Sequence, residues 1–256
     1  MYDFTIRQMN IFYEGKKIYG EIYLPDKERC SAVIISHGLN GTHEGSQDIA
    51  PVFAANGIIA YIFDYCGGAS CNLSDGRSTE MSVLTEAREL SHIIDEIKKI
   101  PQVDPDRLFL LGKSQGCYVS TIVASQRNGE VAGLIGFYPG FGLQELISDE
   151  MKKYEQIPKR MNILNIEVSD LYFKDILSFD IYELMKRYYG NVLLIHGSAD
   201  SIIPLSSAQK AQENFPHAKL IVIEGAEHGF HGPEREEVIQ MAVDFIKKES
   251  GLSSCE

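Results

Sequence analysis

Residues 107–120 read RLFLLGKSQGCYVS, an apolar run followed by a glycine-rich turn and a second apolar segment. The residues Gly112-Lys113-Ser114 match the end of the phosphate-binding loop motif. The pattern G-x-S-x-G around Ser114 matches the turn that presents a serine nucleophile. Both motifs lie between a buried strand and a helix. The neighbouring residues therefore decide between a nucleotide-binding protein and a hydrolase.

A phosphate-binding loop requires a glycine five positions before the second glycine of its motif, because its backbone amides wrap the phosphates. Here that position is Arg107, inside the apolar run, and no room is left for a loop before Lys113. A strand that ends at Leu111, glycines two residues either side of Ser114 and then a helix form the arrangement of a nucleophile elbow. The stretch therefore favours a hydrolase with a serine nucleophile.

Short, solidly apolar runs recur along the chain and predict a parallel sheet, because strands covered by helices on both sides are apolar on both faces. The runs lie at 31–36, 57–63, 107–112, 131–138, 191–197 and 218–225. Apolar residues at helical spacing predict helices at 81–100, 115–126 and 233–250. Residues 4–12 and 17–24 alternate apolar and polar and predict an antiparallel N-terminal hairpin. Together they indicate an α/β fold, a mostly parallel central sheet with helices on both faces.

Residues 141–189 lie between two predicted strands but are too many for a single crossover helix. They form either an ordinary helical excursion packed by its own aromatic side chains or a small inserted cap. A cap would cover the C-terminal edge of the sheet, where open α/β proteins bind their ligands. We favour the cap, and we interpret residues 1–256 as a single domain that carries this insertion.

A serine hydroxyl attacks only when a base removes its proton and a carboxylate holds that base in one tautomer. Asp200 follows one predicted strand and His228 follows the next, so both lie at the sheet edge where Ser114 emerges. The chain order is nucleophile, acid, base. His231, three residues beyond His228, is a rival for the base.

Hydrolysis also requires backbone N–H groups directed at the charge that develops on the carbonyl oxygen. One should come from Gln115, the residue after the nucleophile, at a helix N-terminus. The other should come from the loop HGLNGTHEG at 37–45, whose glycines allow it to fold back toward the elbow. Leu39 is the predicted donor in that loop.

Composition limits the partners and the compartment. The formal charge is −12 at pH 7, whereas nucleic acid or an anionic membrane would require a basic face. No run approaches the length of a membrane-spanning helix, and no secretory signal is visible. The cysteines lack tight zinc spacing, so we interpret Cys30, Cys66, Cys71 and Cys117 as reduced thiols in or near the core, with a Cys66–Cys71 disulfide as the alternative. Reduced thiols suit a cytoplasmic protein. No feature calls for a metal or an organic cofactor.

Seven motifs along the chain resemble the α/β-hydrolase superfamily, and more narrowly the bacterial cinnamoyl and feruloyl esterases. They are ISHGLNGTHEG, FDYCGGASCNLSDGRSTEMSVLTEARELSHIID, LLGKSQGCYVS, FYPGF, DIYE, LLIHGSADSIIP and IEGAEHGF. The second is the most specific to that branch, and the resemblance runs along essentially the whole chain. It implies the α/β-hydrolase fold and a serine carboxylesterase with the triad Ser114, Asp200 and His228.

The resemblance also implies a cap that closes over an aromatic acyl group. Family members place a cap tyrosine against the phenolic end of the substrate in a setting that matches DLYF, which makes Tyr172 a candidate substrate contact. An acidic residue near the start of the cap often contacts the phenol as well, and Glu145 and Asp149 are both available. Lys113 stands where a histidine is common, and we do not expect its side chain to enter the chemistry.

We therefore expect an enzyme that hydrolyses small or hydroxycinnamoyl esters, with a small-molecule ester as its partner. An acylglycerol lipase or an aminopeptidase could use the same triad, and an acidic cap could anchor the amino group of a peptide. The charged segment KKYEQIPKR argues against a long-chain lipase. A non-catalytic binding protein of the same fold is a further alternative. The N-terminal hairpin edge could pair two subunits into a homodimer or be protected in a monomer.

Overall fold

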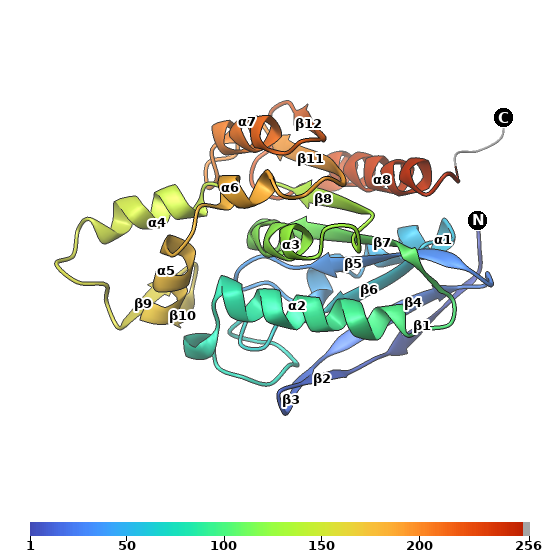
Figure 1. The fold of residues 1–256 in the computed structure, drawn as a ribbon, viewed down its shortest axis with the longest axis horizontal. Coiled ribbons are helices and arrows are strands. Elements are labelled where there is room, and N and C mark those ends of the chain that lie inside the picture. The colour runs from blue at the N-terminus through green and yellow to red at the C-terminus, as the bar shows by residue number, and fades with distance from the viewer. Residues whose placement is uncertain (253–256) are drawn as a thin grey trace.

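An eight-stranded sheet lies at the centre of the computed structural model, which describes residues 1–252 (Figure 1). In spatial order its strands are β1 (Phe4–Gln8), β4 (Gly20–Pro25), β6 (Ile59–Phe63), β5 (Cys30–Ser36), β7 (Val103–Lys113), β8 (Gly133–Phe137), β11 (Asn191–Gly197) and β12 (Ala218–Ile223). β4 pairs antiparallel with both β1 and β6, and every pair from β6 to β12 is parallel. The mostly parallel sheet predicted from the apolar runs is confirmed.

The predicted N-terminal hairpin is present in two parts. β1 and β4 pair within the main sheet, while β2 (Ile11–Tyr13) and β3 (Lys16–Ile18) pair as a separate two-stranded ribbon. The pairing is interrupted near Met9, whose carbonyl accepts a hydrogen bond of 3.0 Å from the hydroxyl of Tyr61. The Tyr61 side chain of β6 thus binds the Met9 carbonyl in place of a backbone N–H from a paired strand. The β2–β3 ribbon continues beyond the main sheet (Figure 1).

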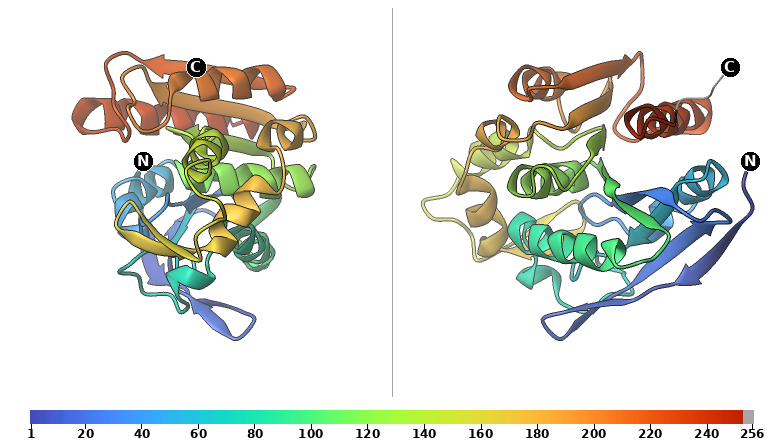
Figure 2. Two further views of the ribbon diagram at one scale, coloured as in Figure 1. Left: turned by 90° about the vertical axis from the view of Figure 1, so that its left-hand side faces the viewer. Right: turned by 45° about the vertical axis from the view of Figure 1, so that its right-hand side comes forward.

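Helices cover both faces of the sheet (Figures 1 and 2). One face carries α2 (Val83–Lys98), α3 (Gln115–Gln126) and α7 (Leu205–Asn214), and the other carries α1 (Ala50–Ala55) and α8 (Gly232–Glu249). Every residue of β5, β6 and β8 is buried. This two-sided cover explains why these strands are apolar throughout instead of alternating.

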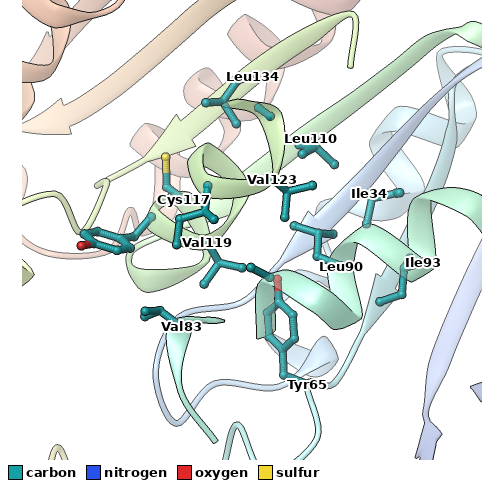
Figure 3. Close-up of a cluster of buried hydrophobic side chains, with 14 of the residues drawn as sticks. Ile34, Tyr65, Val83, Leu90, Ile93, Leu110, Cys117, Val119, Val123 and Leu134 are labelled. Carbon is teal, nitrogen blue, oxygen red and sulfur yellow. The ribbon is translucent and has the colours of Figure 1, made fainter. Parts of the chain in front are cut away.

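The core between the sheet and the helices α2 and α3 is continuous across three strands. Ile34 of β5 and Leu134 of β8 are the register partners of Leu110 in β7, and all three side chains are fully buried. Leu90 from α2 and Val123 from α3 belong to the same cluster (Figure 3). Leu110 therefore lies at the middle of the strand that ends at the G-x-S-x-G turn.

The insertion, residues 141–189, connects β8 to β11. It contains α4 (Leu143–Met151), β9 (Arg160–Ile163), β10 (Ile166–Ser169), α5 (Asp170–Leu177) and α6 (Ile181–Met185). β9 and β10 form a hairpin through Leu164 and Asn165, which both have positive φ, as a two-residue turn between antiparallel strands requires. This hairpin was not predicted from the sequence. The insertion lies at the end of the molecule opposite the N-terminus (Figures 1 and 2).

Two short 3₁₀ helices, η1 (His43–Ser46) and η2 (Ser78–Glu80), lie in loops that follow β5 and β6. Cys30, Cys66 and Cys117 are buried free thiols, as predicted. Cys71 is free but exposed, which corrects the prediction for that residue, because it lies in an irregular loop away from the core. Within residues 1–252 no helix combines the length and the apolar character needed to cross a membrane.

We expect Leu110→Ala to lower the free energy of unfolding by about 2–5 kcal/mol, because it leaves a cavity in the core shown in Figure 3. Urea denaturation followed by circular dichroism measures the change. Ile6→Ala is the control, since the Ile6 side chain in β1 is 55% exposed and its truncation should cost less than about 0.5 kcal/mol. Equal losses in the two variants would contradict the assignment of Leu110 to the core.

Candidate active site

Ser114 occupies the turn between β7 and α3 in a strained backbone conformation, with φ 51° and ψ −122°. Such angles persist only where the surroundings enforce them. The N–H of Ser114 donates to the carbonyl of Phe137 at the end of β8 (3.0 Å), and its carbonyl accepts from Gly140 (2.9 Å) and Cys117 (3.0 Å). The turn is therefore held by the neighbouring strand as well as by its own helix.

The two glycines of the G-x-S-x-G motif are required by close approaches of the backbone. A Cβ on Gly112 would lie 2.3 Å from the Cα of Cys117, and a Cβ on Gly116 would lie 2.4 Å from the carbonyl oxygen of His37. A side chain at either position would push the helix away from the strand or from the loop after β5. The elbow predicted from the motif is present, and its geometry explains the motif.

The structure brings Ser114, His228 and Asp200 together. Nε2 of His228 lies 3.0 Å from Oγ of Ser114, and Nδ1 of His228 lies 2.8 Å from Oδ2 of Asp200. Asp200 follows β11 and His228 follows β12, as predicted from the chain order. The rival base His231 is exposed and precedes the first turn of α8. The geometry therefore selects His228.

The carboxylate of Asp200 is fully buried and surrounded by donors. Its Oδ1 accepts from the backbone N–H groups of Ile202 (2.9 Å) and Ile203 (2.8 Å). Its Oδ2 lies 3.2 Å from Nε2 of His196, which also lies 3.0 Å from the carbonyl of Ile203. Because both neighbours of that nitrogen are acceptors, Nε2 carries the proton, and burial lowers the pKa of His196. The sequence predicted only packing at the strand end for His196 and missed this contact.

Tyr138 supports the imidazole of His228 from the side. Its ring meets the imidazole edge-on, with centroids 4.9 Å apart, and its backbone has φ 37°. Burial raises the pKa of Tyr138 to about 12, so the phenol remains protonated at neutral pH. The motif FYPGF contains this tyrosine, but nothing in its pattern indicated the contact.

The loop after β5 lies directly against the elbow. A Cβ on Gly38 would be 3.0 Å from Cβ of Ser114, so the loop approaches the serine as predicted. His37 holds this loop, because its Nε2 accepts from the N–H of Tyr65 (3.0 Å) and its Nδ1 therefore donates to the carbonyl of Gly38 (2.8 Å). Burial lowers the pKa of His37 to about 4, which keeps the ring neutral at physiological pH.

The two predicted oxyanion donors flank Ser114. Gln115 begins α3, and Leu39 lies in the loop held by His37. Within residues 1–252 neither backbone N–H donates to another residue, so both are free to bind a ligand oxygen. Together with the three side chains they make a site suited to attack on a carbonyl carbon.

Tyr172, the predicted substrate contact of the cap, lies between the insertion and the elbow. Its side chain is fully buried in α5, and its hydroxyl donates a 2.6 Å hydrogen bond to Oε1 of Gln115. A side chain without exposed surface has no face left for a substrate in this structure. A substrate contact at Tyr172 stays a prediction; in this structure its hydroxyl is engaged by a residue of the elbow.

Glu145 and Asp149 also lie apart from the triad. Glu145 pairs with Lys210 (3.2 Å) and Asp149 pairs with Lys152 (2.6 Å). Both acids line a surface hollow of about 330 Å³ between α4 and α7, and none of the triad residues lines it. A role of either acid at the phenol stays a prediction; in this structure both acids line the hollow between α4 and α7.

Lys113 is buried beside the elbow, although the sequence indicated an incidental residue. Its ammonium donates to the carbonyl of Gly45 (2.7 Å), which also accepts from Arg235 (2.9 Å). Arg235 in turn pairs with Asp48. Burial, with the charge of Arg235 as a smaller contribution, lowers the pKa of Lys113 to about 7. The lysine links the elbow to η1 without contacting the triad.

This lowered pKa predicts a stability that depends on pH. In the unfolded chain Lys113 has its ordinary pKa of 10.5, whereas in the folded chain its pKa is about 7. Between these pH values the unfolded state binds more protons than the folded state, so the free energy of unfolding declines as the pH falls. We expect the Tm of Lys113→Met, relative to the parent, to rise as pH falls from 10 to 7, as measured by calorimetry. The carbonyl of Gly45 keeps its bond to Arg235 in this variant.

Lys248→Met is the matched control, because the Lys248 side chain is 78% exposed. Its Tm relative to the parent should not change over the same pH interval. A difference for Lys113→Met that stays constant with pH would show that the buried amine does not titrate as its surroundings indicate.

Comparison with protein families gives two matches. Residues 27–178 match the family model described as serine aminopeptidase, S33, and residues 183–249 match the model described as TAP-like protein. A search among curated proteins found no match. The first model spans more than half of the chain and includes the elbow and the insertion up to α5.

Solved structures with the same fold include several hydrolases. Est1E from Butyrivibrio proteoclasticus, solved with ferulic acid bound, has a TM-score of 0.87 and 20% identity, over 95% of this chain and 99% of that chain. A monoacylglycerol lipase from Paleococcus ferrophilus has a TM-score of 0.69 and 19% identity, over 91% and 99%. Acetyl xylan esterase 1 from Thermoanaerobacterium sp. has a TM-score of 0.67 and 17% identity, over 94% and 88%.

Proposed function

Because the chain belongs to the serine aminopeptidase S33 family of α/β-hydrolases, we propose that it is a serine carboxylesterase acting on small or hydroxycinnamoyl esters. One observation carries the proposal: Ser114 stands on a strained elbow, 3.0 Å from His228, which lies 2.8 Å from Asp200. A serine in this setting has a base to take its proton and a carboxylate to orient that base.

The first half of the reaction forms an acyl-enzyme. Asp200 keeps a proton on Nδ1 of His228, which leaves Nε2 free to accept the proton of Ser114 as Oγ attacks the ester carbonyl. The carbonyl oxygen becomes an oxyanion that the N–H groups of Gln115 and Leu39 stabilise. The tetrahedral intermediate then expels the alcohol, which takes the proton from Nε2.

The second half repeats these steps with water. His228 takes a proton from a water molecule as the water oxygen attacks the acyl carbon, and the same two N–H groups stabilise the second oxyanion. Collapse releases the carboxylic acid and returns the proton from His228 to Ser114. The buried carboxylate of Asp200, with two backbone donors on Oδ1, keeps the imidazole in one orientation throughout.

The choice of ester rests on the likeness to Est1E. The two chains correspond over nearly their whole lengths, and Est1E was solved with ferulic acid, a hydroxycinnamic acid. We propose that the insertion is a cap and that it encloses an aromatic acyl group in a single-domain enzyme. Of the two proposed substrate classes, small esters and hydroxycinnamoyl esters, the latter are the larger ones that such a cap would accept.

Aminopeptidase activity is the second candidate, because the matched family carries that description. A peptidase would need a free carboxylate near the elbow to bind the substrate's ammonium group. The two acids predicted for the cap are instead paired with Lys210 and Lys152 and face a separate hollow. The geometry therefore supports the esterase more strongly.

We expect Ser114→Ala to lower kcat for p-nitrophenyl butyrate by roughly 10⁴-fold or more, because the variant lacks the hydroxyl that His228 activates. A fluorophosphonate probe should label the parent and not the variant. Ser120→Ala is the matched control, since Ser120 is buried in the same helix with an unpaired hydroxyl, and it should keep full activity. Full activity of Ser114→Ala would refute the mechanism, and an inert parent would favour a binding protein.

A substrate panel tests the proposed ester class. We expect kcat/KM for methyl ferulate and p-nitrophenyl butyrate to exceed that for alanine p-nitroanilide and for a long-chain monoacylglycerol by at least about tenfold. The Ser114→Ala variant corrects each rate for background hydrolysis. If the anilide or the monoacylglycerol were preferred, the triad assignment would stand and the substrate class would be wrong.

A further inference from the structure

A buried chain of three polar side chains links the insertion to the elbow and to α2. The hydroxyl of Tyr172 in α5 donates to Oε1 of Gln115 (2.6 Å), and Nε2 of Gln115 donates to Oε2 of Glu86 in α2 (2.9 Å). Tyr172 is fully buried, and Gln115 and Glu86 are each only 1% exposed. Both ends of the Gln115 amide are thus engaged where water cannot replace either partner.

The insertion contacts the other proposed oxyanion segment as well. Nδ2 of Asn40, the residue after Leu39, donates to the carbonyl of Leu164 at the tip of the β9–β10 hairpin (3.0 Å). Oδ1 of Asn40 accepts from the N–H and the hydroxyl of Ser70. The residues that carry or adjoin the two free N–H groups are therefore each bonded to the insertion.

Gln115 is the first residue of α3 and follows a serine whose backbone is strained. A peptide at this position has few backbone bonds of its own, because the first N–H groups of a helix lack partners within the helix. Rotation of the Gln115 side chain would leave the Tyr172 hydroxyl and the Glu86 carboxyl unpaired in the core, where unpaired polar groups are destabilising. The two hydrogen bonds of the Gln115 side chain thereby restrict the orientation of the peptide group that carries the Gln115 N–H.

We propose that Tyr172 and Glu86 are positioning residues that hold Gln115 so that its N–H faces the developing oxyanion. The inference rests on the proposed function. It gives the insertion a second role: besides enclosing the substrate, its docking through α5 completes the oxyanion site. Neither Tyr172 nor Glu86 touches the substrate, and each acts through Gln115 alone.

The surroundings of Glu86 suit a neutral partner for the Gln115 amide. Burial raises the pKa of Glu86 to about 8, the bond from Gln115 lowers it, and the carboxyl of Glu89 on the next turn raises it slightly. Glutamine has the same shape as protonated glutamic acid and can accept the same hydrogen bond. Glu86→Gln is therefore the conservative variant, and Glu86→Leu removes the acceptor while filling the space.

The test compares kcat and KM for p-nitrophenyl butyrate among these variants. We expect Tyr172→Phe and Glu86→Leu each to lower kcat by about 10- to 100-fold with KM nearly unchanged, because a misplaced donor weakens binding of the transition state alone. Glu86→Gln should keep kcat within about threefold of the parent. A trifluoromethyl ketone, which adds to Ser114 and forms an oxyanion, should bind more weakly to the first two variants by a similar factor.

Asp175→Ala is the matched control. Asp175 lies on α5 one turn from Tyr172 and accepts from the hydroxyl of Ser82 in the same α2–α5 contact, but it has no bond to Gln115. It should lower Tm and leave kcat unchanged. A kcat loss in Asp175→Ala equal to that in Tyr172→Phe would overturn the inference, since docking in general would then account for both.

Unchanged kcat in Tyr172→Phe and Glu86→Leu, with Ser114→Ala inactive, would also overturn the inference and leave the proposed function in place. Activity in Ser114→Ala would overturn the proposed function itself. The two failures are therefore distinguishable in one set of variants. Circular dichroism on each variant shows whether a loss of activity comes from unfolding.

Discussion

The strained backbone of Ser114 is the constraint on which the rest of this site depends. A residue with φ 51° and ψ −122° remains in place only if its neighbours cannot relax, and here the end of β8 binds its N–H while Gly140 binds its carbonyl. The contacts at Gly112 and Gly116 leave no volume for a side chain, so strand, turn and helix are packed against one another. The half-buried Ser114 is thereby presented at the sheet edge, with its hydroxyl 3.0 Å from Nε2 of His228.

The parallel sheet converts this one turn into a complete site. The neighbouring strands β8, β11 and β12 all end at the same edge as β7, so the loops that follow them meet around Ser114. Asp200 and His228 need no special local conformation to reach the serine, because strand order brings them there. His196 then contacts the acid at 3.2 Å, and Tyr138 contacts the base through an edge-on ring contact. The triad is thus supported by the buried His196 and the partly buried Tyr138, both packed at the ends of core strands.

The insertion adds polar contacts to an otherwise apolar interface. Phe173 and Ile176 of α5 are buried in the core cluster, and such apolar contacts are non-directional and would tolerate small shifts of the helix. The hydrogen bonds from Tyr172 through Gln115 to Glu86 would not tolerate such shifts, because these buried polar groups would lose their partners if the helix moved. Directional bonds at this place give the insertion a defined position relative to the elbow. In the proposed mechanism, that position matters for the chemistry as well as for substrate access.

The parallel strands of the central sheet, the elbow and the candidate nucleophile, acid and base were predictable from the sequence alone, whereas the β9–β10 hairpin was not. Apolar runs, a G-x-S-x-G turn and the position of Asp200 and His228 after successive strands are local patterns, and the topology of a parallel sheet makes their meeting point predictable. Only the tertiary structure decided what Tyr172 and Glu86 contact, since their bonds to Gln115 join residues 57 and 29 positions apart. Such contacts depend on how an inserted segment packs, and no periodicity records that packing. A buried polar side chain reveals its partner only when the elements that surround it are in place.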